Sequence, residues 1–133
     1  MKVYITHCSA TKDDSLKGTE EKVTPDKLYT SERIQAFMRR CKEKKVNWAI
    51  LSDLYGIWFP WEKHTWYDMD PNEVTQWQFL KLVGDFENKL QDYDEIHFYH
   101  NPARFHHLYQ TLLQVARPRG KVKLISHIED INP

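Results

Sequence analysis

The strongest constraint on the fold is a regular alternation of short β-like runs with longer segments of helical period. The runs are rich in β-branched and aromatic residues and occupy residues 2–7, 46–52, 94–99 and 121–126. The segments between them carry apolar residues three or four positions apart and are long enough for crossover helices. This order predicts βαβ units with right-handed crossovers. We therefore expect an α/β fold, a three-layer sandwich with a small, mainly parallel sheet of about four strands flanked by helices.

Three helices are expected between these runs. The first begins at Thr30 or Ser31, either of which is a good N-cap, and ends near residue 45. Asp-Pro at 70–71 begins the second helix and Asn-Pro at 101–102 begins the third, because proline is favoured in the first helical turn. The buried stripe of the second helix is expected to contain Val74, Trp77, Leu80, Val83, Phe86 and Leu90.

Composition limits the class of protein. A chain of 133 residues suits one domain, and 41% hydrophobic with 14% aromatic residues exclude a disordered chain. Lysine plus arginine and aspartate plus glutamate each total 19, so the net charge gives no attraction to nucleic acid or to an anionic membrane. The first helix has a basic face that is expected to be solvated, with a nucleic-acid patch as the alternative. This face comprises Arg39, Arg40, Lys42, Lys44 and Lys45.

Cysteine content and hydropathy indicate the compartment. Cys8 and Cys41 are too few for the disulfide framework of a small secreted domain, and no apolar signal sequence follows Met1, so we expect a cytoplasmic protein. Charged residues or histidines interrupt every apolar run before it reaches the ~20 residues that cross a bilayer, and no membrane contact is expected. Residues 12–27 are polar and are expected to form a long flexible loop; whether it closes as a lid stays open.

Polar side chains follow every expected strand. They are His-Cys-Ser at 7–9, Ser-Asp at 52–53, His-Asn at 100–101 and Ser-His at 126–127. Ligands of open parallel sheets bind beyond the carboxyl ends of the strands, so these positions predict a site. The alternative is that loops are polar in general.

Cys8 is the best single candidate for chemistry. A thiol at a strand end, next to His7 and near Lys12, is a candidate thiolate nucleophile, and a buried inert cysteine is the alternative. Lys12 is a candidate for binding an anion or supplying an amine, although a loop lysine is solvent-exposed by default. Cys41 lies on an apolar helical stripe and is expected in the core.

Seven histidines and two cysteines lack the spacing of a metal site. His97 and His100 are expected on opposite faces of a strand, and the adjacent histidines at 106–107 diverge by about 100° on a helix. No CxxC or HExxH pattern occurs. A site from His7, Cys8 and His100 is geometrically conceivable, but we expect no metal, and the sequence names no cofactor.

The segment 53–67 lacks helical period and is expected to be irregular. Its aromatic residues form either a wall on which a flat ligand stacks or core packing beneath a loop. They are Trp58, Phe59, Trp61, Trp66 and Tyr67. Farther along, Asn101 and Arg104 place a helix N-terminus and a guanidinium at the end of the third strand, an arrangement that suits phosphate or carboxylate.

Short motifs run through most of the chain. Residues 8–12 read C-S-x-x-K, residues 28–31 read L-Y-x-S, residues 51–60 read L-S-x-x-Y-G-x-x-x-P, and Tyr67-Asp68 follows. This series resembles the uncharacterised domains related to the peroxide-stress protein YaaA. It is also similar to the C-S-x-x-K domain associated with archaeosine synthase and other transglycosylase-like nucleic-acid modification proteins. Asn101-Pro102, Phe105-His106 and Tyr109 are compatible with the same relatives.

The resemblance implies a pocket that gathers the Cys-Ser-Lys loop and the Ser-Tyr-Gly loop and is used on or near nucleobases. In this interpretation Cys8 or Lys12 acts as nucleophile or amine and Ser52 orients the substrate. Tyr55 and Asp68 assist proton transfer or positioning. The expected substrate-binding residues are Ser9, Tyr29, Ser31, Gly56, Pro60, Trp66, Tyr67, Asn101 and Arg104.

We therefore expect a nucleotide- or nucleobase-directed enzyme domain. The alternative is a noncatalytic nucleic-acid- or nucleotide-binding module that uses the same pocket together with Arg39, Arg40 and Lys44. Zero net charge favours a small nucleotide-like ligand over strong binding to a phosphate backbone. Any nucleic-acid substrate must then be held by this domain alone or with the help of a partner protein.

Overall fold

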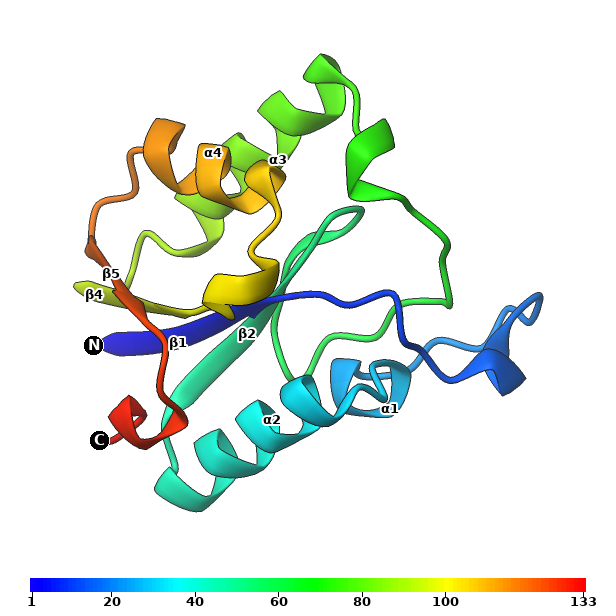
Figure 1. Ribbon diagram of the computed structural model, residues 1–133, viewed down its shortest axis with the longest axis horizontal. Coiled ribbons are helices and arrows are strands. Elements are labelled where there is room, and N and C mark those ends of the chain that lie inside the picture. The colour runs from blue at the N-terminus through cyan, green and yellow to red at the C-terminus, as the bar shows by residue number, and fades with distance from the viewer.

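The computed structural model describes residues 1–133 as one twisted sheet with helices on both faces (Figure 1). The strands are β1 (Lys2–His7), β2 (Asn47–Ser52), β3 (Gly56–Trp58), β4 (Glu95–Tyr99) and β5 (Lys121–Ile125). Their order across the sheet is β3-β2-β1-β4-β5, and every pairing is parallel except that of β2 with β3. The prediction of an α/β sandwich with a mainly parallel sheet is confirmed, with five strands instead of about four.

The additional strand, β3, lies inside the segment that was expected to be irregular. It follows β2 in a tight hairpin in which Gly56 has a φ of +75°. Trp58 is fully buried, and its indole N–H donates to the Glu62 carbonyl at 2.8 Å. Three residues are too few to display the alternation that predicts a strand, so the sequence pattern did not identify it.

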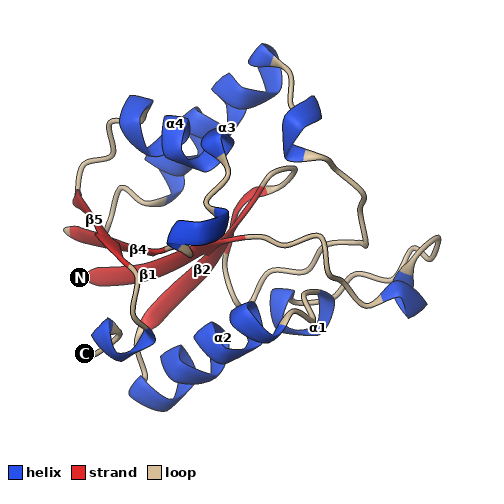
Figure 2. Cartoon of the chain, viewed as in Figure 1, coloured by secondary structure: helices blue, strands red, loops and turns tan.

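Two helices cover each face of the sheet (Figure 2). α1 (Pro25–Leu28) and α2 (Glu32–Lys44) lie on one face, and α3 (Gln76–Lys89) and α4 (His107–Val115) lie on the other. α2 begins as predicted, because the hydroxyl of Ser31 accepts a hydrogen bond from the Ile34 N–H. No helix of the chain is long and apolar enough to cross a bilayer.

α3 and α4 begin later than predicted. The Asp-Pro pair at 70–71 forms only a 3₁₀ turn, and α3 starts after Thr75, which forms a capping box with Gln78. The Asn-Pro pair at 101–102 likewise forms a 3₁₀ turn, and α4 starts after His106. In both cases the carboxamide or carboxylate caps a single turn, which then ends in extended backbone.

The prediction that Trp77 and Leu80 are buried is wrong. They are 71% and 52% exposed, whereas Leu82, Val83 and Phe86 face the core. The physical reason is that apolar residues spaced by three throughout drift by about 60° per step around a helix, so Trp77 lies about 180° from Phe86, whereas Phe79 of the same turn packs against the core.

The strand order creates a switch point beside β1. β2 lies on one side of β1 and β4 on the other, and the helices that lead to them cover opposite faces of the sheet. The connections therefore diverge at the carboxyl ends of β1 and β4, which is where open α/β sheets bind ligands.

Candidate functional site

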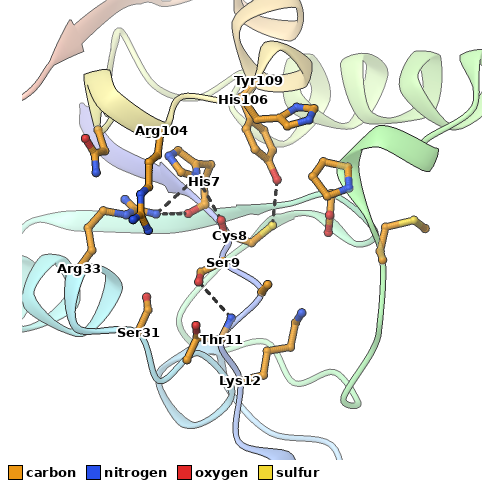
Figure 3. Close-up of a pocket in the computed structure, with 15 residues that line it drawn as sticks. His7, Cys8, Ser9, Thr11, Lys12, Ser31, Arg33, Arg104, His106 and Tyr109 are labelled. Atoms are coloured by element: carbon orange, nitrogen blue, oxygen red, sulfur yellow. Dashed lines mark hydrogen bonds between the residues drawn. The ribbon is translucent and has the colours of Figure 1, made fainter.

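A hollow of about 360 Å³ lies at this switch point (Figure 3). The loop after β1 supplies one wall, the start of α2 a second, and the turn between β4 and α4 a third. Met69 and Pro71, from the segment before α3, complete the lining. The carboxyl ends of the central strands thus converge on one hollow, in agreement with the position expected from the polar residues that follow them.

Cys8 lies in the wall of this hollow with its thiol buried. Its Sγ is 3.1 Å from the hydroxyl of Tyr109. Burial, and after it the charge of Asp53, raises the pKa of the Cys8 thiol to about 11. The thiol is therefore protonated at neutral pH, an environment that matches the buried-cysteine interpretation and opposes nucleophilic attack by a thiolate.

A network of buried hydroxyl groups lies beneath Cys8. The phenol of Tyr67 contacts the phenol of Tyr29 and lies 3.1 Å from the hydroxyl of Ser52. The Ser52 oxygen also accepts hydrogen bonds from the N–H groups of Leu54 and Tyr55. Burial raises the pKa of both phenols well above the ordinary value. These hydroxyls therefore stay neutral and support the hollow from below.

Lys12 lies above this network. Its Nζ is 4.4 Å from the centre of the Tyr67 ring, a cation–π contact, and it forms no ion pair with a carboxylate. The aromatic ring thus holds the ammonium group at the edge of the hollow without neutralising its charge.

Asp53 is the one carboxylate in the wall of the hollow. Its side chain is buried, with the residue 5% exposed, and its Oδ1 has no hydrogen-bond partner. Burial raises the pKa of the Asp53 carboxyl, while hydrogen bonding from Cys8 and Tyr67 and the charge of Lys12 act in the opposite direction. A buried, unpartnered carboxylate oxygen is costly, so Asp53 is poised to accept a hydrogen bond or a proton.

Arg33 contributes a positive charge that no carboxylate balances. Its guanidinium donates to the Thr6 hydroxyl at 2.6 Å and to the His7 carbonyl at 2.9 Å. Burial lowers the pKa of Arg33. Arg104 is exposed at the same hollow and forms no ion pair. Figure 3 shows both guanidiniums on the His7 side, away from Lys12, so this side suits an anionic group.

His7 is a neutral part of the wall. Its Nδ1 lies 3.0 Å from the Cys8 carbonyl, and its ring stacks on Tyr109 with centroids 5.0 Å apart. Burial, followed by the charge of Arg33, lowers the pKa of His7 to about 4. His7 therefore contributes aromatic packing and hydrogen bonding, and its imidazole carries no positive charge at neutral pH.

Several predicted residues do meet at the hollow. Ser9 accepts a hydrogen bond from the Thr11 N–H, Ser31 caps α2, and Asn101 caps the 3₁₀ turn before α4. With Cys8, Lys12 and Arg104 they line one cavity. Tyr29, Tyr67 and Ser52 lie beneath it and do not form its wall.

Other predicted residues lie elsewhere. The Tyr55 hydroxyl donates to the Thr65 carbonyl, and Tyr55 and Gly56 line a neighbouring hollow of about 330 Å³. Asp68 is exposed, and neither it, Pro60 nor Trp66 lines either hollow. The structure therefore separates these residues from Cys8 and Lys12.

The aromatic segment is partly core and partly exposed, and none of its aromatic residues forms a wall of the hollow at the switch point. Trp58 and Tyr67 belong to the core, whereas Trp61 is 69% exposed and stacks on Phe59. None of its tryptophans lines the hollow at the switch point.

No group of three or more His, Cys, Asp or Glu side chains is placed to hold a metal ion.

Arg33 and Tyr109 were given no role in the predicted site, and Asp53 was named only among the polar residues that follow strands. Asp53 directly follows a strand, a signal that the sequence carried. Arg33 lies two residues after the cap of α2, and nothing in the local pattern distinguishes it from the basic residues farther along that helix. Of those, Arg40 is engaged by the C-terminal residues, donating to the Ile131 carbonyl at 3.1 Å.

Comparison of the chain with protein-family models, with curated protein sequences and with solved structures gave no match.

Proposed function

We propose that the hollow at the switch point binds a small nucleotide-like ligand and that the chain is a nucleotide- or nucleobase-directed enzyme. The observation that carries the proposal is the half-buried guanidinium of Arg33, which no carboxylate neutralises. Together with Arg104 it forms a cationic end suited to a phosphate. The resemblance of the C-S-x-x-K and L-S-x-x-Y-G motifs to nucleobase-directed relatives supports the same ligand class.

Asp53 is the proposed proton-transfer group. It lies at the Lys12 side of the hollow, with a buried oxygen that lacks a partner and a pKa that burial raises. A carboxyl with a raised pKa is suited to general acid or base catalysis on a bound base. Lys12 is the second candidate, because its amine is held nearby without a carboxylate partner. Cys8 then serves as a neutral part of the wall.

The backbone after β1 supports anion binding at the same place. The N–H groups of Ser9 and Ala10 donate no hydrogen bond within the protein, and both residues line the hollow. Unpaired backbone donors beside two guanidiniums are typical of phosphate sites.

Binding is tested with nucleosides, nucleoside 5′-monophosphates and inorganic phosphate, by thermal stabilisation and calorimetry. We expect the monophosphates to bind more tightly than the nucleosides, and Arg104→Ala to weaken monophosphate binding about 10-fold. Arg119→Ala is the matched control, because Arg119 is exposed and precedes β5, at the opposite end of the sheet. If no monophosphate stabilises the protein at millimolar concentration, the proposal is wrong.

A noncatalytic nucleotide-binding module is the second candidate. The neutral Cys8 thiol favours it, since it removes the most reactive nucleophile from the hollow. The two candidates are separated by incubating the protein with the ligand that binds and following the ligand by mass spectrometry. A conversion that Asp53→Asn abolishes supports the enzyme; recovery of unchanged ligand, with or without a nucleic-acid partner, supports the binding module.

A further inference from the structure

The polar groups of the hollow are divided between its two ends. Arg33 acts electrostatically on His7, while Lys12 and Cys8 act on Asp53. One end therefore offers the hydrogen-bond donors and positive charge of two guanidiniums, and the other offers a carboxylate oxygen beside the ammonium group of Lys12. A ligand that satisfies both ends carries an anionic group at one end and N–H donors at the other.

Asp53 has a carboxylate oxygen that is free to accept a hydrogen bond from such an N–H group. The residue is 5% exposed, its Oδ1 has no partner, and it forms part of the wall of both neighbouring hollows. Met69 is the other residue shared by the two walls. Asp53 thus lies where two cavities adjoin, on the Lys12 side of the hollow at the switch point.

We propose that Asp53 accepts a hydrogen bond from an exocyclic amino group, so that the hollow selects nucleotides with amino-bearing bases over those with an oxo group at the same position. This inference rests on the proposed nucleotide binding and deepens it. An oxo group brings its lone pairs against the Asp53 carboxylate and leaves the buried oxygen without a donor. An amino group supplies the missing donor.

The preference for an amino group over an oxo group is expected to be strong. Sites that hydrogen-bond a ligand N–H reject analogues lacking it, because the buried polar group of the protein is then left unpaired. A hydrogen bond to a charged partner leads us to expect a preference of about 10- to 100-fold for the amino member of each pair. Each pair differs at the exocyclic group and at the ring nitrogen beside it, which is an acceptor next to the amino group and carries an N–H next to the oxo group: cytidine against uridine 5′-monophosphate, and adenosine against inosine 5′-monophosphate.

The test is calorimetric titration of these four nucleotides at pH 8 into the intact protein and two variants. Asp53→Asn preserves the shape and presents an amide that both donates and accepts, so we expect its preference to fall within about threefold. Asp92→Asn is the matched control, because Asp92 is exposed and precedes β4, at the opposite end of the sheet. It is expected to keep the full preference.

Each outcome decides a different point. Nucleotide binding without an amino preference, or a preference that survives in Asp53→Asn, overturns this inference and leaves the proposed nucleotide site standing. The absence of binding by all four nucleotides overturns both. An amino preference that is lost in Asp53→Asn and kept in Asp92→Asn supports the inference.

Discussion

The thiol of Cys8 lies 3.1 Å from the hydroxyl of Tyr109, although 101 positions separate the two residues in the chain. The contact joins the end of β1 to the first turns of α4 across the switch point. It is formed in a buried environment in which a thiolate is strongly disfavoured. The contact therefore holds the end of β1 against α4, and burial keeps the Cys8 thiol within it protonated.

Cys8 is expected to resist alkylation in the folded protein. With a thiol pKa of about 11, the thiolate is scarce near pH 7, and burial hinders access by the reagent. We expect iodoacetamide to modify Cys8 at pH 7.5 only after denaturation, as followed by mass spectrometry. Cys41 is an internal control, since burial raises its thiol pKa to about 12. Rapid modification of Cys8 alone in the native protein contradicts this account and restores the nucleophile hypothesis.

Tyr109→Phe is expected to lower the free energy of unfolding by about 1 kcal/mol. The substitution removes the hydroxyl that bonds to Cys8 and leaves a buried sulfur without its partner, while the ring and its stack on His7 remain. Urea denaturation gives the difference. Tyr93→Phe is the control, because the Tyr93 hydroxyl makes no hydrogen bond to the protein and its loss is expected to change stability little. Equal effects of the two variants exclude a stabilising role for the Cys8–Tyr109 bond.

His7 is expected to make the protein less stable in mild acid. Its pKa is about 4 in the folded state and 6.5 in the unfolded state, so between these values the unfolded chain binds the additional proton. The contribution is complete above pH 6.5 and is lost as the pH falls through 4. A difference of about 2.5 pKa units corresponds to roughly 3 kcal/mol.

The measurement is chemical denaturation between pH 7.5 and 4, compared with a His7→Phe variant that cannot titrate at this position. The variant is expected to lose stability with a shallower slope across that interval, since phenylalanine retains the aromatic stack and lacks the proton. Parallel pH profiles for the two proteins mean that His7 is not the group responsible.

The fold was largely predictable because the four parallel strands are runs rich in β-branched and aromatic residues whose pattern is local, although the edge strand β5 is largely exposed. Two expectations about the helices failed. Trp77 lies about 180° around α3 from Phe86, because a run of three-residue spacings drifts off the buried face. The Asp-Pro pair at 70–71 is typical of a helix start. It forms only one 3₁₀ turn, because Val74, the residue after that turn, has an extended backbone.

The candidate site was predictable where it depends on strand ends and not where it depends on helix orientation. Cys8, Lys12 and Asn101 follow β1 and β4, and the parallel sheet brings them together. Tyr55 lies close to Ser52 in sequence, but the hairpin into β3 turns its hydroxyl toward Thr65. Arg33 becomes a site residue only because α2 packs with that side chain toward the end of β1, a relation that no local pattern contains.

Gly56→Ala and Gly84→Ala are expected to have opposite effects on stability. Gly56 has a φ of +75°, and a Cβ at this position meets the Asp85 carboxylate, which in turn accepts the Ile57 N–H at 2.7 Å. The substitution therefore strains the backbone and displaces the carboxylate that ties the β2–β3 hairpin to α3, and we expect a loss of about 2–3 kcal/mol. Gly84 lies within α3, and a Cβ there has nothing within 4 Å, so alanine is expected to add about 0.5–1 kcal/mol through helix propensity. Urea denaturation of both variants checks the pair.

Because the hairpin carries Asp53 at the end of β2, Gly56→Ala is also expected to weaken nucleotide binding, whereas Gly84→Ala leaves it unchanged. A Gly56→Ala variant as stable as the original protein means that the hairpin does not have this backbone conformation.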